Sequence, residues 1–189
     1  TLNDTMDLSG AYSTGIFAQS LGGSDSDGGD ITVTLNADLS SSGTGGWGIV
    51  AQSDGYDDAG NVTINVESGA TLSTGSSSVE GNEAVHIISG NKVEINNAGT
   101  ISNLYAGYAI VSETELTITN SGTIYGNFDL ENDFSNSLIN ESSGVLEPGS
   151  TFYIGDSGTL TNSGTLSPGG KNNIITTKMK GTFTTDETD

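Results

Sequence analysis

One short block recurs along this chain and constrains its fold more than any other feature. Ile31-Thr-Val-Thr-Leu-Asn returns as Val62-Thr-Ile-Asn-Val-Glu, Val93-Glu-Ile-Asn-Asn and Leu116-Thr-Ile-Thr-Asn, and two shorter copies follow. Each copy alternates apolar with polar residues, which is typical of a strand with one buried face. The central apolar residues lie about 20 to 31 positions apart, in the range of solenoid repeats. These are Val33, Ile64, Ile95, Ile118, Leu138 and Leu160.

Two further blocks accompany each copy. After a turn signal such as Ser121-Gly122, a second short strand is predicted, centred on Leu39, Leu72, Ile101, Ile124, Leu146 and Leu166. A third block precedes the first, and it reads Gly15-Ile-Phe-Ala-Gln-Ser and then Gly48-Ile-Val-Ala-Gln-Ser. Strands that return at this period can pair with their equivalents one repeat away. We therefore predict an all-β fold, a right-handed single-stranded parallel β-helix with three short strands per coil and roughly six to seven coils.

The predicted solenoid occupies the whole chain as a single segment, 1–189. It divides into an N-terminal lead-in coil at 1–14, stacked coils at 15–170, and a last strand with an acidic tail at 171–189. Leu, Ile, Val and Phe make up only about 22% of the residues. A core one side chain wide needs few apolar residues, so this composition favours a solenoid over a thick globule. Asparagines recur beside the core, and we expect their amides to stack in successive coils. They are Asn97, Asn120, Asn140 and Asn162.

Charge and composition exclude several classes of function. The chain carries 4 Lys and Arg against 24 Asp and Glu, a formal net charge of −20, and no cysteine. Binding to nucleic acid or to an anionic membrane through phosphate neutralisation is therefore excluded, as are disulfides and thiolate metal sites. No apolar run reaches the roughly 18 residues of a membrane span. The chain opens with Thr1-Leu2-Asn3 and without a signal peptide, so we expect an internal segment or a processed product.

Acidic insertions precede two copies of the first block, at 21–30 and 54–60. Equivalent positions in adjacent coils should bring these loops together. Carboxylates between glycine hinges suit Ca²⁺, although neither loop matches the EF-hand pattern. The candidate calcium ligands are Asp25, Asp27, Asp30, Asp54, Asp57 and Asp58. The alternative is a solvated acidic ridge that keeps the molecule soluble.

Catalytic patterns are weak. Gly155-Asp-Ser-Gly158 resembles the surroundings of a serine nucleophile, but His86 lies several coils away and is predicted to point outward between Val85 and Ile87. The chain has no arginine, and Lys92 is the sole lysine of the early coils, so the machinery of an acidic-polysaccharide lyase is poorly supplied. Paired Thr32/Thr34 and Thr117/Thr119 resemble the threonine ranks of ice-binding proteins, although Glu94 interrupts them.

The motifs together resemble passenger domains of Gram-negative autotransporters. The resemblance rests on the Gly-Ile-Phe-Ala-Gln-Ser block, on the recurring Asn-x-Gly-Thr-[Ile/Leu], and on Gly164-Thr-Leu-Ser-Pro-Gly-Gly170 with an earlier copy at Leu146-Glu-Pro-Gly149. Such a passenger is secreted by the type V route and displayed at the cell surface from a C-terminal outer-membrane β-barrel. The signal peptide, the complete C-terminal cap and the barrel of that family are not in this sequence.

The resemblance implies a surface-exposed adhesin or structural stalk that binds through its loops, without catalysis and without a cofactor other than the calcium considered above. Its expected partner is a glycan or protein on a host or neighbouring cell. Two alternatives stay open, namely a polysaccharide-active lyase or hydrolase and a self-associating module that aggregates cells. Because anionic rods repel one another, self-association would need divalent cations or low pH.

Overall fold

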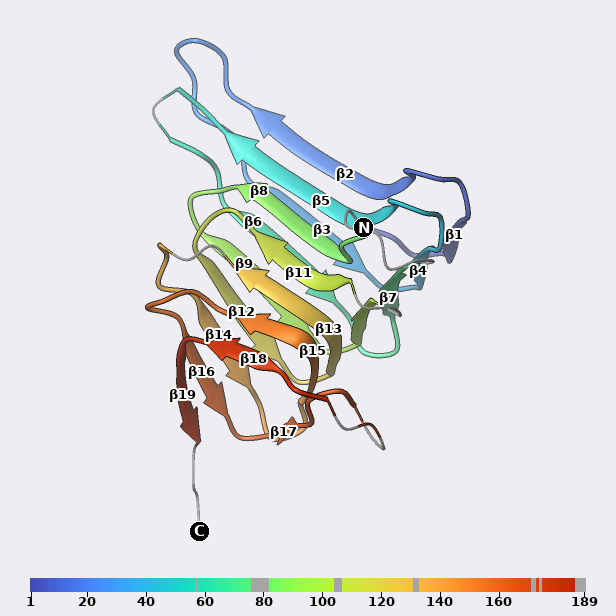
Figure 1. The fold of residues 1–189 in the computed structure, drawn as a ribbon. Coiled ribbons are helices and arrows are strands. Elements are labelled where there is room, and N and C mark those ends of the chain that lie inside the picture. Colours follow the sequence, from blue (N-terminus) through green and yellow to red (C-terminus); the bar gives the residue numbers. More distant parts are fainter. Residues whose placement is uncertain are drawn as a thin grey trace.

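A computed structural model covers the chain and describes residues 1–56, 58–75, 82–103, 107–130, 133–170, 173 and 175–185. Within these residues every paired strand is parallel to its neighbours, and no helix is present. Figure 1 shows the strands stacked along one axis, with the colour running from blue at one end to red at the other. The predicted all-β architecture of parallel strands is confirmed, and it is consistent with a parallel β-solenoid.

The strands form three stacks, which we call faces 1, 2 and 3. Face 1 contains β1 (Met6–Leu8), β4 (Leu39–Ser41), β7 (Thr71–Thr74), β10 (Thr100–Asn103), the first halves of β13 (Thr123–Leu130) and β15 (Val145–Tyr153), and β17 (Thr165–Leu166). Face 2 contains β2 (Thr14–Leu21), β5 (Trp47–Asp54), β8 (Val85–Ser89), β11 (Tyr108–Ser112), the second halves of β13 and β15, and β18 (Lys178–Lys180).

Face 3 is a separate seven-stranded sheet. It contains β3 (Ile31–Leu35), β6 (Val62–Val66), β9 (Val93–Asn97), β12 (Leu116–Asn120), β14 (Ser137–Asn140), β16 (Thr159–Asn162) and β19 (Thr182–Thr185). Its register places the predicted central residues directly over one another, from Val33 on Ile64 to Leu138 on Leu160. The alignment made from the repeat is therefore confirmed.

Faces 1 and 2 are not separated in every coil, which differs from the expectation of three distinct short strands. In β13 and β15 the strands of both faces join into one long strand, and this joins the two faces into a twelve-stranded sheet. The chain bends within β13 at Gly126, whose φ of 130° lies in a region that side-chain-bearing residues rarely adopt. No insertion separates the two strands at this corner, so a bend suffices.

The core is a narrow column of aliphatic side chains between the faces. Residues such as Ile64, Ile95 and Ile118 are completely buried. Phe128 and Phe152 stack edge to face inside face 2, with ring centroids 4.9 Å apart. Within the described residues, two strands rather than the one predicted follow position 171, since β18 and β19 close faces 2 and 3. The described part of the chain contains no helix that could cross a membrane.

The predicted asparagine column is confirmed as a hydrogen-bonded ladder at the C-terminal edge of face 3. The amide Nδ2 of Asn97 donates to Oδ1 of Asn120, Asn120 donates to Asn140, and Asn140 donates to Asn162, each over 2.7 Å. The first three asparagines of the ladder are buried, and their Nδ2 groups also donate to carbonyl oxygens in the following turns. The asparagines therefore satisfy turn backbone that would otherwise be buried without partners.

Candidate functional site

Two acidic loops extend from the ends of β2 and β5 and lie side by side, as Figure 1 shows. The backbone amide of Gly22 donates to the carbonyl of Asp54, Tyr56 donates to Ser26, and Gly28 donates to Asp58. The prediction that the insertions stack is confirmed. Between the loops lies an open cavity of about 390 Å³, lined by Leu21, Gly22, Gly23, Ser24, Asp54, Gly55 and Tyr56.

Several of the candidate calcium ligands already bind backbone groups. Asp27 Oδ1 accepts a hydrogen bond from the amide of Asp58, and Asp30 Oδ1 accepts one from Asn61. Asp54 Oδ1 accepts one from Gly55. The bonds of Asp27 and Asp30 therefore hold one loop against the next, whereas the bond of Asp54 is local to its own turn.

The remaining candidates give no metal geometry. Asp25 and Asp58 are exposed, and Asp57 lies outside the described residues. Among the residues that the structure describes, no three histidine or acidic side chains come together as a metal-binding group. Ca²⁺ binding therefore stays a hypothesis that rests on composition, while the observed contacts of Asp27, Asp30 and Asp54 are structural.

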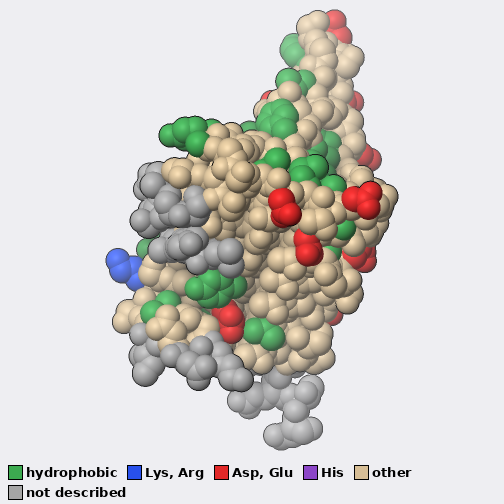
Figure 2. All heavy atoms as spheres, turned by 90° about the vertical axis from the view of Figure 1, so that its right-hand side faces the viewer, with side chains coloured by type: hydrophobic (Ala, Val, Ile, Leu, Met, Phe, Trp, Pro, Cys, Tyr) green, Lys and Arg blue, Asp and Glu red, His purple; other side chains and the backbone are tan. Residues whose placement is uncertain are grey.

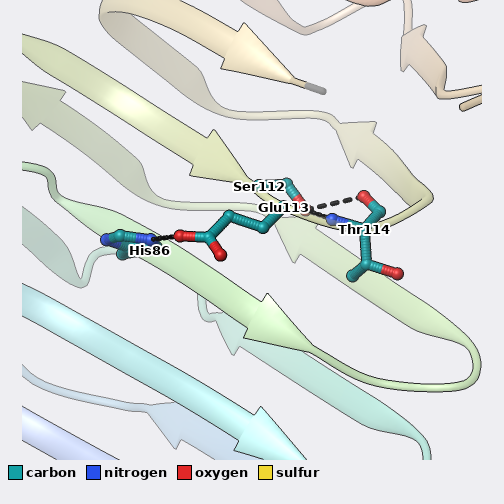
Figure 3. Close-up of polar contacts among 4 residues, drawn as sticks. All are labelled: His86, Ser112, Glu113 and Thr114. Carbon is teal, nitrogen blue, oxygen red and sulfur yellow. Dashed lines mark hydrogen bonds and ion pairs between the residues drawn. The ribbon is translucent and has the colours of Figure 1, made fainter. Parts of the chain in front are cut away.

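His86 points outward from β8, as its flanking residues predicted, and pairs with Glu113. Val85 and Ile87 are fully buried beside it. The Nε2 atom of His86 lies 3.0 Å from Oε1 of Glu113, and the two side chains are 21% and 51% exposed. Figure 3 shows the contact between His86 and Glu113 and, separately, the buried Ser112, whose hydroxyl donates to the carbonyl of Thr114 over 2.8 Å. Neighbouring coils thus contribute an acid and an imidazole to one surface.

The serine motif lies elsewhere. Gly155 and Gly158 enclose a tight turn before β16, in which the amide of Gly158 donates to the carbonyl of Gly155. Ser157 is exposed in that turn, and Gly155 has a φ of 91°. His86 pairs with Glu113 on face 2, and no contact links it to this turn in the described residues. Lys92 pairs with Glu94 on face 3 at 2.8 Å, which partly neutralises the charge that interrupts the threonine rows.

A surface that the motif search missed lies on the outer side of face 2. Phe17, Val50, His86 and Val111 stack in register there, one from each of β2, β5, β8 and β11. The register continues to Asp129, and burial raises the pKa of its carboxyl above the ordinary value. Alternation within Gly-Ile-Phe-Ala-Gln-Ser could have revealed this surface, because it places Phe17 and Gln19 outward when Ile16 and Ala18 point inward.

Among the charged side chains of the surface, acidic ones predominate. Figure 2 shows them spread over the side of the molecule that lies at the right of Figure 1, with hydrophobic side chains gathered mainly in the upper half. In the described part of the chain, Lys92 lies in the turn before β9, and Lys178 and Lys180 lie on β18, the last strand of face 2. Lys180 pairs with Asp156.

Comparison with known proteins adds no assignment. No protein-family model matches the chain, no curated protein matches its sequence, and no solved structure matches its fold.

Proposed function

We propose that this chain is a surface-displayed, non-catalytic binding segment, an adhesin or stalk of the autotransporter passenger type. The stacking of parallel strands along one axis supports the proposal most directly, because it produces a rod from which the loops after β2 and β5 project. Loops on a rigid scaffold are the usual position for binding residues. The partner is a glycan or protein of a host or neighbouring cell.

The finer features of the fold belong to the same proposal. The coils are right-handed, following the rule for parallel crossovers, and number six to seven. Each new coil pairs with the edge of the previous one, so a chain that leaves a secretion pore can fold progressively. The absence of cysteine suits this route, since disulfides formed in the oxidising periplasm would prevent the unfolded chain from passing through a narrow outer-membrane pore. A C-terminal outer-membrane barrel in the parent protein would complete the display system.

Cell binding tests the proposal. Fluorescently labelled protein is expected to bind intact epithelial or bacterial cells saturably, and unlabelled protein is expected to compete. A variant in which residues 22–27 and 55–57 are shortened to Gly-Ser turns is the control for loop-mediated binding. Absence of saturable binding to every cell type tested would contradict an adhesive role and leave that of a stalk.

The two alternatives have separate tests. A polysaccharide-active enzyme would release reducing or unsaturated ends from pectin, alginate or hyaluronan, and we expect none. Self-association would appear as a dimer or larger species in sedimentation velocity with Ca²⁺ or at pH 5, and we expect a monomer because the net charge of −20 opposes side-by-side contact.

A further inference from the structure

The outer side of face 2 carries a patch unlike the acidic remainder of the surface. We call it the aromatic–amide patch and define it by Phe17 and Gln19 of β2, Trp47 and Gln52 of β5, and His86 and Ile88 of β8. Adjacent parallel strands place these residues in neighbouring rows. Ile88 lies two positions beyond His86 and shares its outward side, and a register shift after Ala51 pairs Gln52 with Ser89.

The apolar half of the patch is a shallow groove. It has a volume of about 240 Å³ and is lined by Thr14, Phe17, Trp47, Val50, His86 and Ile88. Phe17 is 57% exposed, so one face of an aromatic ring is available to a ligand. The groove is smaller than the ~300–1,000 Å³ of sites for drug-sized ligands, so it accommodates one ring of a longer molecule that continues along the face.

The polar half consists of two stacked amides. Gln19 Nε2 donates to Gln52 Oε1 over 2.7 Å. This bond uses one donor hydrogen of Gln19 and one acceptor site of Gln52. Gln19 Oε1 and Gln52 Nε2 have no protein partner in the described part of the chain, so an acceptor and a donor remain available beside the aromatic ring. The His86–Glu113 pair adds a further polar group at the opposite side of the groove.

Charge limits the kind of ligand. None of the residues of β2, β5 and β8 is Lys or Arg, and Glu113 borders the patch, within a chain of net charge −20. An anionic ligand would meet repulsion without a compensating cation. A purely apolar partner would leave the two glutamine groups desolvated and unpaired. The matching ligand has an uncharged apolar face and hydroxyl groups at its edge.

We propose that the aromatic–amide patch binds a neutral glycan, with one sugar ring against Phe17 and its hydroxyls hydrogen-bonded to Gln19 and Gln52. A pyranose presents C–H groups on one face and hydroxyl donors and acceptors around its edge, and both halves of the patch satisfy these groups. This inference rests on the proposed adhesive function and specifies its partner class. It also moves the contact from the acidic loops to the flat outer side of face 2.

Isothermal titration calorimetry tests the proposal with the whole chain. The probes are cellohexaose, chitohexaose and mannohexaose, with hexagalacturonate as the anionic comparison. At least one neutral probe is expected to bind, and hexagalacturonate is not. Phe17→Ala should weaken binding about tenfold, and Gln52→Ala several-fold. Both side chains lie on the surface, so circular dichroism should show the folded structure retained. Ile139→Ala removes a 39% exposed apolar residue of face 3, outside both the patch and the two acidic loops, and should leave affinity unchanged.

Three results would overturn the proposal: no heat with any neutral probe, binding that Phe17→Ala leaves intact, or equal affinity for hexagalacturonate. The cell-binding assay separates this outcome from failure of the adhesive role. If the Phe17→Ala variant bound cells as strongly as the wild type, the adhesive role would stand and the glycan site at the patch would be refuted. Neutral glycan binding without cell binding would support the patch and refute adhesion.

Discussion

Replacing Asn120 by alanine is expected to destabilise the protein more than any other single change in the asparagine ladder. Asn120 is fully buried at the centre of the column. It accepts a hydrogen bond from Asn97 and donates to Asn140, to Gly122 and to Val145. Alanine removes all four contacts and leaves the buried Oδ1 of Asn140 without its amide donor. One stranded acceptor costs about 1–3 kcal/mol and each of the two short amide–amide bonds about 1 kcal/mol, so we expect a loss of roughly 3–5 kcal/mol.

The matched control is Asn162→Ala, at the half-buried end of the same ladder. Asn162 accepts one bond from Asn140, whose Nδ2 also reaches the carbonyls of Gly144 and Thr165, and it donates one bond to the carbonyl of Gly164. Nothing buried is stranded, so we expect a loss of about 1–2 kcal/mol. Urea unfolding followed by circular dichroism measures both variants. Equal losses at the two positions would refute the ladder argument, since burial and stranding differ between them while the chemical change is identical.

Three further predictions concern the corners, the acidic loops and face 2. Gly122→Ala should destabilise the protein by more than the ~1–2 kcal/mol expected for Gly69→Ala. A Cβ at Gly122 would lie 2.1 Å from the carbonyl oxygen of Gly99, whereas Gly69 has open space around it and only a positive φ. A lower melting temperature for Gly69→Ala than for Gly122→Ala would contradict this. Asp30→Ala should cost about 1 kcal/mol and Asp30→Asn much less, because asparagine still accepts the amide bond; equal losses, together with a Ca²⁺-dependent melting temperature in the parent only, would instead indicate metal binding. Asp129→Asn should stabilise the protein at pH 7 and have no effect below pH 3.8, because a carboxyl whose pKa is raised by folding makes the folded state lose stability as pH rises through that pKa. Urea unfolding midpoints at pH 7 and below pH 3.8 measure this difference, and an equal shift at the two pH values would exclude the electrostatic cause.

The asparagine ladder begins at a boundary that the structure explains. Leu35 and Val66 occupy the same column in the preceding coils, and Val66 lies directly over Asn97. The buried Oδ1 of Asn97 therefore has no hydrogen-bond donor. The column is apolar in the coils that precede Asn97 and consists of asparagines from Asn97 onward, and the unsatisfied oxygen lies at this boundary.

The repeat predicted most of the fold because strand stacking repeats a local pattern. Alternation places Ile64, Ile95 and Ile118 inward in any parallel arrangement, and their equivalent positions within the repeated block bring them into register. The fusion of faces 1 and 2 at β13 was not predictable from this pattern, since it depends on a bend at Gly126 that alternation does not reveal. Likewise the pattern placed the loop that contains Asp27 and Asp30 beside the loop at 54–60, but it did not reveal their bonds to particular amides.

For the candidate site, the sequence by itself determined the composition and which side chains of a strand point outward. It established the acidic charge, the scarcity of cations, and the outward positions of His86 and, by the same alternation, Phe17. Only the tertiary structure decided which outward side chains share a surface. Phe17, Val50 and His86 are each more than thirty positions from the next, and a one-residue shift in β8 pairs Gln52 with Ser89 instead of Ile88. The side of the sheet on which a side chain lies follows from the two-residue period of its own strand. Which side chains of adjacent strands lie next to it depends on the register, and insertions and bulges change the register without altering that period.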